Sequence, residues 1–537
     1  MGRVGVSPIA PAVRRALLAL YAVSLFMAFP QELPGGLVFD GGWLFAWIVP
    51  AALVAGIAGL TPRRAAHEAF VASLVAHWAI FYWFFVVTVR YGGLPAALGV
   101  ITPLLPTLYF AALSAAFAWG WARFVRDGPF PIVVGAMLWV ALDWVRAHFV
   151  LGGFPWSTLG YALHLDAPLL AWTRWTGVYG LSFVAAAAGI ALAGAALERS
   201  RGRVRALAIT AGAVALAHGA GLAMGPVELG SPVTVRIAAV QGNIDQGQKW
   251  DARVRDRILE TYLRLSGEAA ERGASWIVWP ETAVPGLVEA DPALRARIER
   301  FARERGVAMV IGGTGVEIDL EARRFSAFYD SAFLVDRTGA VLDRYDKTHL
   351  VPFGEYVPLR AALGRFFQAL ATGLSSTDVS AGEAPRAMAI PPEDASRPLL
   401  RAGVPICYEL LFPQLVRRFV ADGAGVLLAI TNDAWYGRTG APHQFLALTA
   451  LRAAENGRWV VRAANTGISA IIDARGRVRQ ASPLFEEAVL GADVPVASGA
   501  APTFYTRMGD VFAALCIAAS VVLLGRRVWL DRSRADA

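Results

Sequence analysis

Cysteine, lysine and charged residues in general are scarce in this sequence. Of its 537 residues two are cysteine and only 17% are charged, against about a quarter in an ordinary soluble protein. Two cysteines cannot form a disulfide framework, and the seven histidines show no metal-binding spacing with them or with one another. We therefore expect no metal site and no cofactor.

Apolar residues are what the sequence has in excess. Hydrophobic residues make up 56% of the chain, and the mean hydropathy is +0.47. So much apolar surface must be hidden from water, and a lipid bilayer hides it. The net charge of +8 does not indicate a nucleic-acid partner, because no basic stripe with interleaved aromatic residues is present.

Eight apolar segments are candidates for bilayer-crossing helices, which need roughly 20 mostly apolar residues each. They are Ala16–Phe29, Leu37–Leu60, Ala69–Val89, Leu94–Phe117, Ile132–Val150, Leu169–Leu197, Leu207–Met224 and Gly509–Leu524. The fourth contains Pro103 and Pro106, so we expect it to be kinked. The pattern predicts a polytopic α-helical membrane protein, with seven spans in residues 1–225 and an eighth span with a tail in residues 509–537.

Arginines between the segments predict the side of the membrane that each loop occupies. The pairs Arg14–Arg15 and Arg63–Arg64 and the four arginines between Arg199 and Arg205 fall on one side, whereas the alternate loops hold few. Because cytoplasmic loops carry the excess of Lys and Arg, we expect both termini in the cytoplasm. Seven spans then place residues 226–508 outside the cytoplasm.

Residues 226–508 have the composition of a soluble protein and alternate between strand and helix patterns. Strands are expected at Val233–Gln241, Ser275–Pro280 and Val426–Asp433, and helices at Asp251–Glu271, Pro413–Val420 and His443–Gly457. Arg337-Thr338-Gly339 is typical of a hairpin turn, and the Pro- and Ala-rich stretch Ala381–Pro398 is expected to be a loop. The alternation with some hairpins predicts an α/β domain with mixed sheets.

Three residues of this domain could perform chemistry together. Glu281 ends a buried apolar strand, where partial desolvation would raise its pKa and fit it to take a proton from a thiol. Lys347 could stabilise an oxyanion and lower the pKa of a thiol, with Glu355 placed to hold this lysine or the substrate. Cys407 could form a thioester with an acyl group. Their ordinary alternatives are an exposed strand-end carboxylate, a solvated turn lysine and a buried core thiol.

The scarcity of lysine draws attention to the lysines that are present. Of the 50 basic residues only Lys249 and Lys347 are lysine. A buried lysine can lose its proton, which an arginine cannot do. For Lys249, chance retention is the simpler interpretation.

The order of three motifs resembles that of the nitrilase, or carbon–nitrogen hydrolase, superfamily. These motifs are WPE ending at Glu281, YDK ending at Lys347, and CYE beginning at Cys407. With the apolar segments, and with GFPWSTLGY (Gly153–Tyr161), VQGNIDQGQKW (Val240–Trp250) and NDAWYG (Asn432–Gly437), nearly the whole chain resembles the apolipoprotein N-acyltransferases. The resemblance implies a nitrilase-like αββα sandwich in residues 226–508, on the periplasmic side of a bacterial inner membrane.

The resemblance also implies a reaction and its site residues. Glu281, Lys347 and Cys407 would form the catalytic triad, supported by Glu355, Tyr408 and Glu409. An acyl chain would pass from a phospholipid, expected to be phosphatidylethanolamine, through a Cys407 thioester to the N-terminal amine of a diacylated apolipoprotein. From the residues themselves, Trp250 and Trp435 are expected either to line an acyl groove or to pack in the core, and Val357–Leu370 to form either an amphipathic lid or an ordinary surface helix. The protein is expected to act as a monomer.

One position departs from the family pattern, and two other functions remain open. The family tends to have Asn where this chain has Asp330, and no role is assigned to this residue. A membrane-tethered amidase would use the same triad with water as the acceptor. A transporter or scaffold with a degenerate nitrilase-like domain is the other alternative, since the intramembrane Asp143 is of a kind that transporters use.

Overall fold

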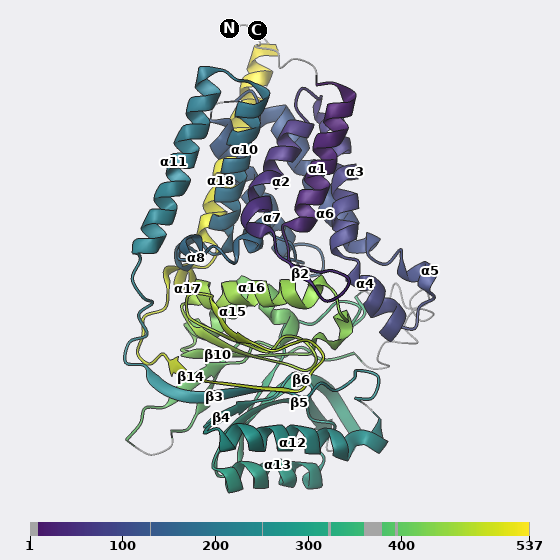
Figure 1. Ribbon diagram of the computed structural model, residues 1–537, viewed down its shortest axis with the longest axis vertical. Helices are drawn as coiled ribbons and strands as arrows, with labels where there is room; N and C mark the ends of the chain where they lie inside the picture. The colour runs from purple at the N-terminus through teal and green to yellow at the C-terminus, as the bar shows by residue number, and fades with distance from the viewer. Residues whose placement is uncertain are drawn as a thin grey trace.

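The molecule consists of a helical bundle and an α/β domain that lies below it in Figure 1. The computed structural model describes residues 9–128, 130–249, 251–319, 324–358, 378–392 and 396–535. Both termini lie at the end of the bundle that faces away from the α/β domain (Figure 1). The termini and the α/β domain thus lie at opposite ends of the bundle.

The bundle is built from helices that correspond to the predicted apolar segments. The longer ones are α1 (Pro11–Met27), α2 (Gly42–Gly56), α3 (Pro62–Ile80), α6 (Leu104–Gly120), α7 (Pro131–His148), α10 (Val178–Leu197), α11 (Arg201–Ala223) and α18 (Val511–Ala535). Shorter elements connect them: β1 (Gln31–Glu32), β2 (Val38–Phe39), α4 (Trp83–Phe85), the π-helices η1 (Val86–Tyr91) and η2 (Trp121–Val125), α5 (Ala96–Gly99), η3 (Leu159–Leu163), α8 (Ala167–Leu170) and α9 (Thr173–Thr176). The α4–η1–α5 segment projects sideways from the bundle, close to the α/β domain (Figure 1).

The predicted number of eight spans is met only in part. Among the described residues, four helices are long and apolar enough to cross a membrane: Ala96–Val125, Val178–Leu197, Arg201–Ala223 and Val511–Leu530. A fifth is added if α3 and the following Trp83–Tyr91, which are bent by 51° relative to each other, form one broken span. The helices α1 and α2 have 17 and 15 residues, which is short of the roughly 20 that a straight span needs.

The α/β domain contains two six-stranded mixed sheets. One has the strand order β14-β3-β4-β5-β6-β7 and the other β13-β12-β11-β10-β9-β8. The strands of the first are β3 (Val233–Gln241), β4 (Trp276–Val278), β5 (Ala308–Asp319), β6 (Arg324–Val335), β7 (Val341–Asp346) and β14 (Ala488–Val496). Those of the second are β8 (Ala387–Ile390), β9 (Leu400–Gly403), β10 (Val426–Thr431), β11 (Trp459–Ala464), β12 (Ala470–Ile472) and β13 (Val478–Ala481).

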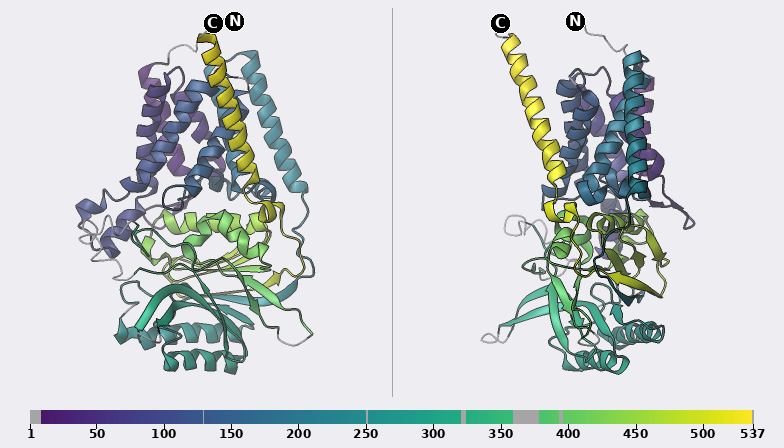
Figure 2. Two further views of the ribbon diagram at one scale, coloured as in Figure 1. Left: turned by 180° about the vertical axis from the view of Figure 1, so that it is seen from behind. Right: turned by 90° about the vertical axis from the view of Figure 1, so that its left-hand side faces the viewer.

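Helices cover the outer faces of both sheets, which gives the predicted αββα order of layers (Figures 1 and 2). The 3-10 turn η4 (Ala252–Val254) leads into α12 (Arg255–Glu271), which packs with α13 (Pro292–Arg305) on the first sheet. Between the second sheet and the membrane bundle lie α15 (Pro413–Ala421) and α16 (Gly440–Asn456), followed at the chain's return to the bundle by α17 (Phe504–Met508). The 3-10 turns η6 (Cys407–Leu411) and η7 (Asp433–Tyr436) follow β9 and β10.

Local sequence signals explain where several of these elements begin and end. Asp291 caps α13, because its Oδ1 accepts a hydrogen bond from the backbone N–H of Leu294 at 3.0 Å. Gly306 ends the same helix with a φ of 64°, which glycine adopts without strain. The expected hairpin joins β6 and β7, with Gly339 at a φ of 85°. The loop prediction for Ala381–Pro398 was wrong in part, because it contains the edge strand β8.

Direct side-chain contacts join the bundle to the α/β domain. The indole N–H of Trp156 donates to Gln444 Oε1 at 2.6 Å, and Tyr161 Oη donates to the Leu411 carbonyl at 3.4 Å. Glu455 of α16 accepts a hydrogen bond from the backbone N–H of Val178, the first residue of α10, at 3.0 Å. Since these contacts are buried, the bundle and the α/β domain share one continuous interior.

Candidate active site

The three predicted catalytic residues come from the ends of different strands and meet in the α/β domain. Glu281 follows β4, Lys347 follows β7, and Cys407 begins η6 after β9. All three side chains are buried, with exposed fractions of 6%, 0% and 7%. The thiol of Cys407 interacts electrostatically with both Glu281 and Lys347. The structure therefore brings the three groups to one place.

The ammonium group of Lys347 lies among three carboxylates. Its Nζ is 3.0 Å from Glu281 Oε1, 2.5 Å from Glu355 Oε1 and 3.4 Å from Asp330 Oδ2. Glu355 in turn accepts a hydrogen bond from the backbone N–H of Val351 through Oε2 at 2.9 Å. Glu355 thus holds Lys347 in position. Oxygens of the three carboxylates lie within 4.8 Å of one another, as in a metal site, but the ammonium group already supplies the cation that they surround.

The backbone at the site is strained in two places. Cys407 has a φ of 44° and Thr282, next to Glu281, has a φ of 46°. Non-glycine residues rarely adopt this left-handed region, and such outliers cluster at active sites. At Cys407 the sharp turn joins the isolated bridge between Ile406 and Ile430 to the first turn of η6.

The protonation states differ from those expected from the sequence. Burial disfavours the charged form of Glu281, but the charge of Lys347, with hydrogen bonds from Asp330 and Lys347 and the charge of Lys249, outweighs burial and holds the pKa of Glu281 below its ordinary value. The expected rise of this pKa was therefore wrong. Burial and the nearby Glu281 raise the pKa of Cys407 well above its ordinary value, although Lys347 lowers it as expected. The resting site thus pairs a neutral thiol with an ionised carboxylate.

Glu409 connects the turn at Cys407 to the end of β7. One carboxylate oxygen accepts from Tyr345 Oη at 2.7 Å and from the backbone N–H and the hydroxyl of Thr348, both at 2.8 Å. The other accepts from the backbone N–H of Ile406 at 2.8 Å. Glu409 therefore fixes the residue before the thiol relative to the residue after Lys347.

We expect Glu409→Gln to lower both stability and activity. Both oxygens of Glu409 accept hydrogen bonds, so the amide N–H₂ of the glutamine would face a hydrogen-bond donor in place of one of these oxygens. The unsatisfied donor should lower the free energy of unfolding by about 1–3 kcal/mol. The unfolding midpoint and the rate of acyl transfer should both fall, whereas Glu383→Gln, at an exposed glutamate, should change neither. An unchanged midpoint and rate in Glu409→Gln would exclude this connecting role.

Lys249 is a second buried lysine at the site. Its Nζ donates to the carbonyl oxygen of Glu281 at 3.1 Å and to Thr282 Oγ1 at 2.5 Å. Burial lowers the pKa of Lys249 to about 8, against the opposing charge of Glu281. Lys249 is therefore a buried part of the site, which chance retention of a lysine would not lead one to expect. The rarity of lysine was the only sequence signal, and it could not specify the contact.

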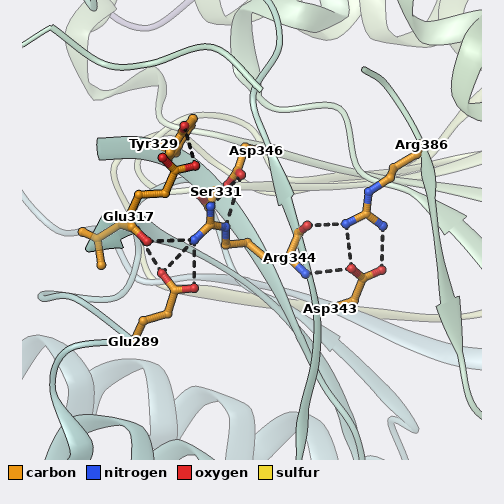
Figure 3. A network of polar contacts seen from close by, with 9 residues as sticks. Glu289, Glu317, Tyr329, Ser331, Asp343, Arg344, Asp346 and Arg386 are labelled. Carbon is orange, nitrogen blue, oxygen red and sulfur yellow. Dashed lines mark hydrogen bonds and ion pairs between the residues drawn. The ribbon is translucent and has the colours of Figure 1, made fainter. Parts of the chain in front are cut away.

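A network outside the buried site fixes the pairing of β6 with β7 (Figure 3). Ser331 and Asp346 are cross-strand partners, and the backbone N–H of Lys347 donates to the Asp330 carbonyl at 2.9 Å. Arg344 donates to Asp346 Oδ2 at 2.9 Å and to Glu289 Oε1 at 2.8 Å. The network thereby holds the two strand ends that carry Asp330 and Lys347.

Arg344→Met should weaken this pairing more than Arg386→Met does. Arg386 binds Asp343 and the Arg344 carbonyl on the other side of β7 (Figure 3) and serves as the matched control. We expect Arg344→Met to cost about 1–2 kcal/mol of stability, since a half-buried charge network is lost, and to reduce acyl transfer several-fold. Equal effects of the two variants on acyl transfer would contradict this interpretation.

The surroundings of Cys407 extend toward the membrane bundle. Tyr408 Oη donates to the Gly153 carbonyl at 3.4 Å, and its ring stacks on His349 with centroids 5.6 Å apart. Trp435, which is 39% exposed, meets the ring of Tyr91 in η1 edge to face at 5.4 Å. Tyr408 and Trp435 therefore both contact the bundle. Trp250 and most of the proposed lid Val357–Leu370 lie outside the described residues.

The loop after β10 contains a buried pair that the sequence did not indicate. Asp433 of the NDAWYG motif accepts from Arg462 Nη2 at 2.7 Å and from Thr431 Oγ1 at 2.8 Å, and both charged side chains are fully buried. Gly467 lies so close that a Cβ there would be 2.1 Å from Asp433 Oδ2. This packing fixes the start of η7, which carries Trp435.

The fold and the site define a membrane-embedded relative of the carbon–nitrogen hydrolases. The Carbon-nitrogen hydrolase family matches residues 236–501, and the Apolipoprotein N-acyltransferase N-terminal domain matches residues 21–191. The chain belongs to the apolipoprotein N-acyltransferase family, because it is 39% identical to the apolipoprotein N-acyltransferase of Geobacter metallireducens over 94% of both chains.

A second relative agrees with this assignment. The apolipoprotein N-acyltransferase of Pseudomonas putida is 34% identical over 84% of this chain and 86% of its own. Among solved structures, an amidase from Nesterenkonia sp. is 21% identical, covering 53% of this chain and 97% of its own, with a TM-score of 0.37.

Proposed function

We propose that this protein transfers an acyl chain from a phospholipid to the N-terminal amine of diacylated apolipoproteins, through a thioester on Cys407. The observation that carries the proposal is the contact of Lys347 with Glu281, beside the Cys407 thiol, in a domain packed directly on a membrane bundle. A phospholipid acyl chain would cost about 0.8 kcal/mol per CH₂ to expose to water, so a lipid donor favours a site at the bilayer surface.

The first half-reaction acylates the enzyme. Glu281 takes the Cys407 proton, and the thiolate attacks the sn-1 ester carbonyl of the phospholipid, expected to be phosphatidylethanolamine. Lys347 and a backbone N–H near Tyr408 stabilise the oxyanion. As the intermediate collapses, the ester C–O bond breaks, and the departing lysophospholipid takes the proton from Glu281.

The second half-reaction deacylates the enzyme. The α-amine of the diacylglyceryl-cysteine attacks the thioester carbonyl and gives a proton to Glu281. The C–S bond then breaks, the amide is released, and Cys407 recovers a proton from Glu281. The two products leave in turn, so the kinetics are ping-pong.

The arrangement of the bundle and the α/β domain also bears on where the protein works. The arginine distribution and the shared position of the termini favour an orientation with both termini in the cytoplasm and residues 226–508 outside it. Because the relatives are bacterial apolipoprotein N-acyltransferases, we propose that the membrane is the bacterial inner membrane and that residues 226–508 lie on its periplasmic side. We propose that the protein works there as a monomer, with a phospholipid and an apolipoprotein as its partners.

The test is a two-stage incubation of the full-length protein in detergent. With phosphatidylethanolamine alone, intact-mass analysis should detect one acyl chain on the protein. Addition of a diacylated lipopeptide should then discharge that chain and yield a triacylated peptide. Release of free fatty acid without a triacylated product would support a membrane-tethered amidase instead, and the absence of any acyl-enzyme would support a non-catalytic role.

A further inference from the structure

More carboxylates than cations are buried around Lys347. Oxygens of Glu281, Asp330 and Glu355 lie within 4.8 Å of one another, and each carboxylate contacts the one ammonium group. Three ionised carboxylates beside Lys347 would leave two uncompensated negative charges. Lys249, which interacts with Glu281 and Asp330, would compensate one of them.

A buried cluster of this kind retains a proton. Uncompensated charge out of contact with water is unfavourable, and carboxylates that share a site do not all ionise. The nearby Cys407 thiol carries no positive charge, so it cannot compensate the one negative charge that remains. One of the three carboxyl groups is therefore expected to be a neutral acid.

The hydrogen-bond donors around each carboxyl group indicate which one is neutral. Both oxygens of Glu355 accept a hydrogen bond, from Lys347 at 2.5 Å and from the Val351 N–H at 2.9 Å. Glu281 accepts from Lys347 at 3.0 Å. Asp330 has the longest contact with Lys347, 3.4 Å, and its buried Oδ1 has no donor. An oxygen without a donor is the one that gains by carrying a proton itself.

We propose that Asp330 is a neutral carboxylic acid in the resting enzyme and that it donates a hydrogen bond to the ionised Glu281. Burial and the adjacent Glu281 carboxylate also raise the pKa of Asp330 well above its ordinary value. Asp330 is then a positioning residue, which acts by holding the carboxylate of Glu281.

The consequence for the reaction rests on the proposed function. When Glu281 accepts the Cys407 proton, the negative charge moves from the Glu281 carboxylate to the thiolate. Asp330 keeps its own proton, so the total charge of the cluster and the thiol does not change. A neutral Asp330 also attracts the Lys347 ammonium group only weakly, which fits their long contact of 3.4 Å. The third N–H of Lys347 is thereby left for the oxyanion.

The experiment compares the pH dependence of acyl transfer in the wild type, Asp330→Leu and Asp330→Asn. Asp330→Leu removes the donor, so kcat/KM should fall about tenfold or more. Asp330→Asn can donate from its amide and should restore most of the loss. In the wild type, activity should decline at high pH as Asp330 ionises beside Glu281. In Asp330→Asn this decline should move to higher pH, because the amide does not titrate.

Two kinetic results would overturn the proposal. If Asp330 were instead an ionised partner of Lys347, Asp330→Asn would lose activity as Asp330→Leu does, and its decline would move to lower pH as Lys347 loses a counter-charge. If Asp330 had no role, all three proteins would share one profile. Absence of transfer in the wild type would refute the proposed function itself and is thus a distinguishable outcome.

A spectroscopic measurement does not depend on activity. The infrared spectrum of the full-length wild type should contain the C=O stretch of a protonated carboxyl group at neutral pH. This band should appear in the difference spectrum of wild type minus Asp330→Asn and be missing from that of wild type minus Glu355→Gln. The subtraction removes the bands of other buried acids, such as Glu455, whose pKa burial raises to about 7. If the first difference spectrum has no such band, or if the band appears in the second instead, Asp330 is not the neutral acid.

Discussion

Cys407→Ala is expected to abolish acyl transfer, with a loss of about 10⁴-fold or more in kcat/KM, as when a nucleophile is removed from a triad. The three carboxylates of the buried site contact Lys347, and the proposed mechanism uses Cys407 alone as the nucleophile. Incubation with phosphatidylethanolamine should leave the mass of this variant unchanged.

The chain offers a matched control for this variant. Cys516 is the only other cysteine, a buried thiol in α18, and Cys516→Ala should still gain one acyl chain. A persistent acyl adduct in Cys407→Ala would refute the thioester mechanism. Loss of the adduct in Cys516→Ala would indicate that the bundle, rather than the nucleophile, limits the reaction.

Lys347→Met should have the second-largest effect. Without the ammonium group, burial would dominate at Glu281 and raise its pKa, so the base would become protonated and unable to accept the Cys407 proton. The oxyanion would lose a donor as well, which typically reduces the rate by about 10²–10³-fold. We expect a combined loss at least this large, measured as the rate of acyl-enzyme formation.

Stability should change together with activity in this variant. Removal of one partner from a buried ion pair costs about 3–5 kcal/mol, so the unfolding midpoint of Lys347→Met should fall. Lys249→Met is the comparison, since Lys249 contacts the backbone of Glu281 and a hydroxyl rather than a carboxylate. If both variants form the acyl-enzyme at the same rate, Lys347 has no special part in the chemistry.

Sequence patterns predicted the strands and motif residues that depend on the local sequence alone. The strand Val233–Gln241 was predicted with its observed bounds, because the stretch is short and rich in the β-branched residues Val, Ile and Thr that favour strands. The residues Glu281, Lys347 and Cys407 could be identified because each one ends a short motif. Their convergence could not be derived from spacing alone, because it depends on how two separate sheets pack.

The features that the sequence did not predict depend on contacts between distant segments. The strand β14 (Ala488–Val496) pairs with β3, which lies more than two hundred residues earlier in the sequence. The pKa of Glu281 was predicted in the wrong direction because burial was considered without Lys347. No role was predicted for Asp330, because its surroundings come from distant segments: the residues that follow β4 and β7, and the loop that holds Glu355.

The junction between the bundle and the α/β domain makes the catalytic part unsuitable for excision as an independent module. Arg452 and Glu455 are fully buried, and their partners Tyr161 and the Val178 N–H belong to the bundle. A fragment of residues 226–508 would present this ion pair and the surrounding apolar residues to water. Any graft of this domain onto a different anchor would therefore have to carry the loop from Gly153 to Val178 with it.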